Sequence, residues 1–135
     1  MTLKLSTAVR NARLNAIEAT IGASAVLRLY TGTNPTTTTG ASTGTLVAQM
    51  VLSTSWMAAA SSGVCAFDGT WADTSADANG TVGCFRILNT DSTTVGIQGT
   101  VTGSTGGGDM TVDNPIVVAG QSITVTGFTL TDANG

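Results

Sequence analysis

The first part of the chain carries hydrophobic residues at helical spacing. In the segment from Leu5 to Gly22, helix-forming residues dominate, Ser6 or Thr7 can cap the start, and Gly22 can take the left-handed conformation after the end. On a helix that turns by about 100° per residue, the apolar side chains form two adjoining stripes. The polar residues fall on the opposite side: Asn11, Asn15 and Glu18. The pattern predicts one helix of about four turns.

From residue 23 onward the hydrophobic spacing changes to period two, which is typical of half-buried strands. The segments predicted as strands are residues 25–31, 45–52, 64–72, 81–88, 93–102 and 122–131, with a weaker one at 115–118. In the last long segment the alternation of Ile123 and Val125 slips by one residue before Phe128 and Leu130. Gly127 stands at the slip, and a β-bulge there would return Phe128 and Leu130 to the same face.

Turn-forming residues separate the predicted strands. Residues 89–92 supply a hairpin turn, and the glycine-rich residues 103–109 form a longer flexible connection. Because no second helical pattern exists to form parallel crossovers, the sequence predicts a mainly β fold. We expect an antiparallel β-sandwich or jelly roll with one N-terminal α-helix, in a single domain of residues 1–135. Residues 31–45 are rich in Thr and Gly, so we expect this loop to be mobile until a partner subunit orders it.

The residue inventory excludes much enzyme chemistry. The chain has no His and only one Lys, one Glu and one Tyr, so imidazole triads and His-ligated metals are impossible. We therefore expect no enzyme activity, no catalytic residue, no cofactor and no metal site. A net charge of −3 argues against a nucleic-acid partner. No stretch approaches the roughly 18 to 20 apolar residues of a membrane span, and polar residues interrupt the region where a secretory leader would lie, so we expect neither membrane insertion nor export.

Charge is distributed unevenly along the chain. Residues 1–30 carry four cations against Glu18, a net charge of +3, whereas residues 31–135 carry Arg86 against seven aspartates, a net charge of −6. The N-terminal segment is thus suited to dock on an acidic surface, its own or a neighbour's. Arg10 and Arg13 border the apolar stripes of the predicted helix. They either lie over the edge of the core or donate hydrogen bonds to a neighbouring subunit.

Two further groups of residues allow alternative functions. In the acidic segment 68–80, Asp73, Asp77 and Asn79 could bind Ca²⁺, and Asp68, Asp73 and Asp77 could act as paired catalytic carboxylates. The segment lacks the regular calcium-loop pattern and is favoured as a solvated loop. Trp56 and Trp71 could stack on a sugar in a carbohydrate-binding adhesive module if they were exposed, although core positions are favoured.

The two cysteines also leave two possibilities open. Cys65 and Cys84 could form a disulfide if they lie on neighbouring strands. In a chain that stays in a reducing cytoplasm, small buried thiols are favoured instead.

Several runs of residues resemble small virion structural proteins of tailed bacteriophages. These are residues 3–11 followed by Leu14 and Ile17, residues 27–35 (LRLYTGTNP), residues 71–77 (WADTSAD), Gly80-Thr81 and Phe85-Arg86. The resemblance implies a capsid cement (decoration) protein, or a neck or tail component, and carries over no catalytic or binding residues. The implied partners are the major capsid protein and copies of the chain itself as a dimer or trimer. The implied location is the virion, assembled in the host bacterial cytoplasm.

The candidate interface follows from the basic helix and the polar loop, which both stand to gain order from neighbouring subunits. Its residues are Lys4, Arg10, Arg13, Thr36, Thr37, Thr38 and Thr39.

Overall fold

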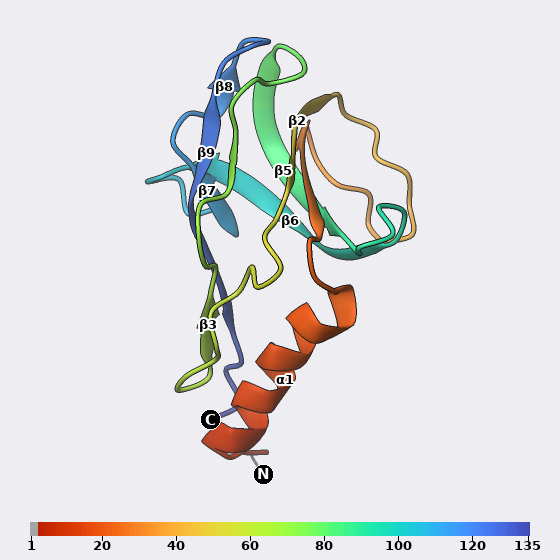
Figure 1. Ribbon diagram of the computed structural model, residues 1–135. Helices are drawn as coiled ribbons and strands as arrows, with labels where there is room; N and C mark the ends of the chain where they lie inside the picture. Colours follow the sequence, from red (N-terminus) through yellow and green to blue (C-terminus); the bar gives the residue numbers. More distant parts are fainter. Residues whose placement is uncertain (1–2) are drawn as a thin grey trace.

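The predicted helix is present as α1 (Thr7–Ile21) in the computed structural model, which describes residues 3–135 (Figure 1). The Ser6 hydroxyl accepts a hydrogen bond from the Val9 backbone N–H at 3.3 Å, which caps the first turn. Gly22 ends the helix with φ of 103°, a conformation that a residue with a side chain rarely adopts. Both helix boundaries therefore lie where the capping residues predict them.

Nine strands follow the helix. They are β1 (Val26–Thr31), β2 (Leu46–Val51), β3 (Val64–Ala66), β4 (Ala72–Asp73), β5 (Gly80–Leu88), β6 (Val95–Gly103), β7 (Met110–Val112), β8 (Ile116–Val117) and β9 (Ile123–Thr131). The prediction of one strand over residues 64–72 is wrong, because the chain leaves the ladder between β3 and β4. Gly69, with φ of 77°, turns the backbone there. The short strand β7 was not predicted, since three residues carry too little pattern to recognise.

The strands form one open, curled sheet in the order β2-β1-β5-β6-β7-β9-β3, with β4 paired to β9 and β8 paired to β5. All pairs are antiparallel except β6 and β7, which run parallel because the loop of residues 104–109 carries the chain back before β7 begins. This parallel pair departs from the purely antiparallel arrangement that we predicted. The architecture otherwise confirms the predicted mainly β, sandwich-like fold with one N-terminal helix.

The predicted bulge in β9 is present. Thr111 of β7 lies opposite Gly127, and Val112 lies opposite Val125, so Thr126 is the extra residue. The shift places Phe128 in the core on the same side as Val125.

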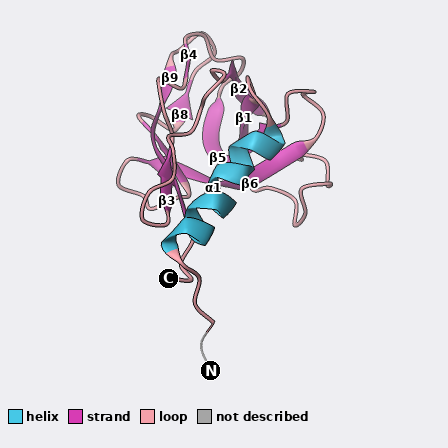
Figure 2. Ribbon diagram, turned by 60° about the horizontal axis from the view of Figure 1, so that its bottom comes forward, coloured by secondary structure: helices cyan, strands magenta, loops and turns pink. Residues whose placement is uncertain are grey.

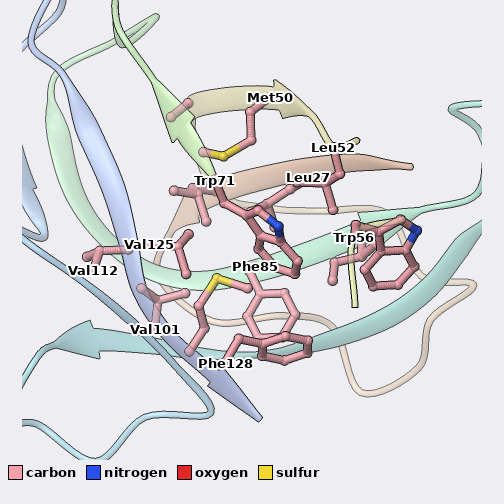
Figure 3. Close-up of a cluster of buried hydrophobic side chains, with 14 of the residues drawn as sticks. Leu27, Met50, Leu52, Trp56, Trp71, Phe85, Val101, Val112, Val125 and Phe128 are labelled. Carbon is pink, nitrogen blue, oxygen red and sulfur yellow. The ribbon is translucent and has the colours of Figure 1, made fainter. Parts of the chain in front are cut away.

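The core lies inside the curl of the sheet, and its bulkiest side chains are aromatic (Figure 3). Trp71 contacts Trp56 and Phe128 with ring centroids 6.0 and 5.7 Å apart, and Phe85 meets Phe128 edge-to-face at 5.4 Å. These four side chains are 0–3% exposed. Aromatic contacts at such separations add to the stability gained from burial.

Helix α1 lies across one end of the sheet, and the C-terminus lies near its start (Figures 1 and 2), where Leu5 N donates to Asn134 O. Leu14 and Ile21 are buried in the core. The polar side of the helix also faces protein, because three side-chain oxygens accept hydrogen bonds from the backbone of the segment before β3. The pairs are Asn11 with Gly63 N, Asn15 with Ala60 N, and Glu18 with Met57 N. Their spacing of three to four residues places the three side chains on one side of the helix, where they supply acceptors for backbone N–H groups of a segment that is not in a sheet.

Candidate interaction surface

The basic residues of the N-terminal segment converge on the C-terminal end of the chain. Lys4 Nζ donates to Gly135 O at 3.1 Å, and Arg10 Nη1 donates to Asp132 O at 3.0 Å. Arg13 Nη1 lies 3.1 Å from Asp132 Oδ2 in an ion pair whose acid is buried. The N-terminal segment was expected to dock on an acidic surface of its own chain or of a neighbour, and in this structure it contacts Asp132 of its own chain. The Arg10 guanidinium is bonded to the Asp132 carbonyl, whereas the Arg13 side chain is 56% exposed.

We expect the two arginines to differ in their contribution to stability. The Arg10 guanidinium lies against the backbone of Gly63, where an added Cβ would collide with it, and Arg10 also bonds to a backbone carbonyl. Replacing Arg10 with Ala should lower the free energy of unfolding by about 1 to 2 kcal/mol. Replacing Arg13 with Ala removes only a half-exposed ion pair and should cost less than about 1 kcal/mol. Urea unfolding of the two variants tests this, and equal losses would contradict it.

The loop that contains Thr36–Thr39 is held by the sheet of the same chain. Arg86 of β5 donates from Nη2 to the carbonyl oxygens of Thr37 and Thr38, both at 3.3 Å, and from Nη1 to Ser42 Oγ at 3.2 Å. Asn34 Nδ2 donates to two strand carbonyls, Phe85 O and Gly99 O. These hydrogen bonds show which groups of the chain itself can hold the loop, and the ordering of residues 31–45 by a partner subunit stays a prediction. The loop lacks apolar anchors, and polar side chains of the sheet take their place.

Arg86 belongs to a polar row that crosses four strands. Gln49, Arg28, Arg86 and Gln98 lie in register on β2, β1, β5 and β6. Each arginine turns to its flanking glutamine, since Arg28 Nε donates to Gln49 Oε1 at 2.8 Å and Arg86 Nε donates to Gln98 Oε1 at 3.0 Å. Two like charges therefore face each other across one strand pair, an arrangement that destabilises a sheet unless something offsets it. Sequence reasoning did not single out this row.

Two depressions lie next to each other at the start of β6. The first, which we call the arginine hollow, has a volume of about 460 Å³ and is lined by Thr38, Thr39, Gly40, Ala41, Arg86, Thr93, Thr94 and Val95. The second, which we call the helix groove, lies between α1 and the β5–β6 turn and is lined by Arg13, Ala16, Ile17, Thr20, Ile21, Asn89, Thr94, Val95 and Gly96. Because they share Thr94 and Val95, the two depressions form one continuous surface. It brings together three of the predicted interface residues, Arg13, Thr38 and Thr39, but not Lys4, Arg10, Thr36 or Thr37.

The acidic segment 68–80 is a structured loop. Asp73 accepts hydrogen bonds from Gln49 N and Ser75 N, and Asn79 accepts one from Ala119 N. Within residues 3–135, no three Cys, Asp or Glu side chains gather in a way that could hold a metal ion. Asp68, Asp73 and Asp77 therefore do not combine into a site of the kind that Ca²⁺ requires.

The tryptophans and cysteines lie in the interior. Trp56 and Trp71 are 0% and 2% exposed, so neither can stack on a sugar in this fold, and the condition for the carbohydrate-binding alternative is not met. Cys65 and Cys84 are buried free thiols on β3 and β5, strands that are not paired with each other. Burial raises the pKa of both thiols, which keeps them protonated and poorly reactive.

Comparisons of the chain with protein families, curated proteins and solved structures find no match. In the part of the chain that the structure describes, no helix is long and apolar enough to cross a membrane.

Proposed function

We propose that the chain is a non-enzymatic structural protein of a tailed-phage virion, and that it acts as a capsid cement protein. In this role it bridges adjacent major capsid subunits and stabilises the shell. A protein that binds at many equivalent positions needs only modest contacts at each one, because each bridge makes the next contact intramolecular.

The observation that carries the proposal is the structural use of the acidic side chains. Seven of the eight accept hydrogen bonds from the chain's own backbone: Glu18, Asp68, Asp73, Asp91, Asp109, Asp113 and Asp132. Carboxylates used in this way hold turns and strand ends of the fold in place. This use favours an assembly subunit over an enzyme, and the resemblance to phage virion proteins, carried chiefly by residues 3–11, 27–35 and 71–77, favours a place in the particle.

The two edge strands of the sheet favour association with a partner through side chains rather than through backbone hydrogen bonds. The edge strand β2 is covered where Asp77 N donates to Val47 O, and Ala58 N donates to Ala66 O at the other edge strand, β3. Covered edges disfavour association by strand addition. The surface formed by the arginine hollow and the helix groove remains as the contact region.

Quantitative mass spectrometry of purified virions from the phage that encodes the chain tests the proposal. A cement protein should be present in a copy number of the same order as the major capsid protein. A copy number matching one small ring would instead assign the chain to the neck or tail. Absence from purified particles would overturn the virion assignment altogether.

A further inference from the structure

Arg86 carries a full positive charge, and no carboxylate of residues 3–135 lies in salt-bridge contact with it. Its side chain is only 5% exposed, and an arginine stays protonated at every physiological pH. Among residues 3–135 the one ion pair is that of Arg13 with Asp132. Asp91, in the β5–β6 turn close in sequence to the lining residues Thr93 and Thr94, accepts hydrogen bonds from the backbone N–H groups of both, which hold the pKa of its carboxyl below the ordinary value and fix it in the turn.

Almost all N–H donors of the Arg86 side chain have an acceptor, but every acceptor is a neutral group. The guanidinium has five N–H groups. Nε and Nη2 donate to Gln98 Oε1 and to the carbonyl oxygens of Thr37 and Thr38, and one N–H of Nη1 donates to Ser42 Oγ. The second N–H of Nη1 has no acceptor within the described chain. A buried charge with neutral partners leaves an electrostatic cost that a nearby anion would offset.

Two observations point to an anion that comes from outside the chain. Arg86 lines the arginine hollow, which opens between the Thr38–Ala41 loop and the β5–β6 turn. The second cation, Arg28, lies beside Arg86 in register and uses only its Nε within the chain. This pair raises the positive potential on one face of the sheet with no carboxylate in salt-bridge contact.

We propose that the arginine hollow is a carboxylate-binding site, filled by an Asp or Glu side chain of a partner protein. One formal charge and one open N–H match a carboxylate better than a phosphate, which usually gathers several cations or a helix N-terminus. The hydroxyl of Thr38, on the wall of the hollow, can donate to its second oxygen. This chemistry is independent of where the chain sits in a virion.

A partner side chain is favoured over a free carboxylate because the site by itself is weak. One cation and one open N–H hold a small anion poorly, whereas a side chain delivered by a docked protein arrives at high effective concentration. The helix groove, which shares Thr94 and Val95 with the hollow, offers apolar surface to the body of such a partner.

Acetate alone serves as the probe of the site. In a titration followed by NMR, we expect acetate, but not chloride at equal ionic strength, to shift the Arg86 Nε–H signal and the Thr93 and Thr94 amides together and saturably. The expected dissociation constant is weaker than about 1 mM. If acetate caused no shift, the arginine hollow would not be a carboxylate site. If acetate saturated the site far below about 1 mM, a free carboxylate would be sufficient as its ligand, and the proposal of a partner side chain would be wrong.

A carboxylate placed at the rim provides a second test that leaves Arg86 intact. Ala41 is exposed, lines the hollow and makes no side-chain hydrogen bond, so Ala41→Glu and its neutral match Ala41→Gln should both fold. We expect Glu to raise Tm by about 4 °C over Gln at pH 7 and to abolish the acetate response. Arg86 lowers the folded-state pKa of this carboxyl, so the gain should be lost as the pH falls below about 4. Equal Tm values with an unchanged acetate response would contradict the proposal.

Discussion

Replacing Trp71 with Ala should lower the free energy of unfolding by about 3 to 5 kcal/mol. Trp71 is 2% exposed and contacts three aromatic rings, those of Trp56, Phe67 and Phe128. Removing its side chain opens a cavity at the centre of the curled sheet, and the neighbouring rings can fill it only in part. Because small domains are stable by only about 5 to 15 kcal/mol, the variant should unfold at a markedly lower urea concentration.

A matched control separates the core position from the surface. Ile116 is a large apolar residue that is 66% exposed, and Ile116→Ala should change stability by less than about 0.5 kcal/mol. A loss below about 1 kcal/mol for Trp71→Ala would contradict the described core and would reopen the possibility that Trp71 is a surface residue that binds a ligand.

Replacing Arg86 with Met should release the loop of residues 32–44 and destabilise the fold by about 2 to 4 kcal/mol. Methionine keeps much of the volume and removes the buried charge, but it leaves the carbonyl oxygen of Thr38 without its donor and removes one of the two donors of Thr37 O. The Gly40 amide, which bonds to Thr37 O, should then exchange with solvent much faster. Hydrogen exchange across the loop, together with urea unfolding, measures both effects.

Arg28→Met is the control for this prediction. Arg28 lies opposite Arg86 in the same row, is only partly buried and makes one side-chain hydrogen bond, to Gln49. Its removal also relieves the repulsion between the two arginines, so we expect a change within about 0.5 kcal/mol and unchanged loop exchange. If the loop stayed equally protected in Arg86→Met, the arginine would not be its anchor.

The sequence predicted the parts of the fold that depend on local pattern. Capping at Ser6 and Gly22 bounded the helix, period two located most strands, and the slip around Gly127 located the bulge. The split between β3 and β4 could not be predicted, because Trp71 fits a strand pattern equally well and only its place in the core shows that the chain turns first.

The candidate surface was predicted only in part for a related reason. Asn11, Asn15 and Glu18 looked like a solvent-facing stripe, but they bond to backbone N–H groups far along the chain. The role of Arg86 depends on long-range pairing with Gln98 and with a loop more than forty residues away. Hydrophobic periodicity reports which face of an element is apolar, and it contains no information on which polar groups meet across the fold.

Cryo-electron microscopy of the intact virion tests the central proposal most directly. We expect the fold to fit density on the capsid shell, at junctions between major capsid subunits, with the arginine hollow against a neighbouring subunit. Removal of the gene should then leave shells that lose integrity at a lower temperature, and the purified chain should restore it. Density for the chain at the neck or tail, or complete shells with no density for it, would contradict a role in capsid cementing.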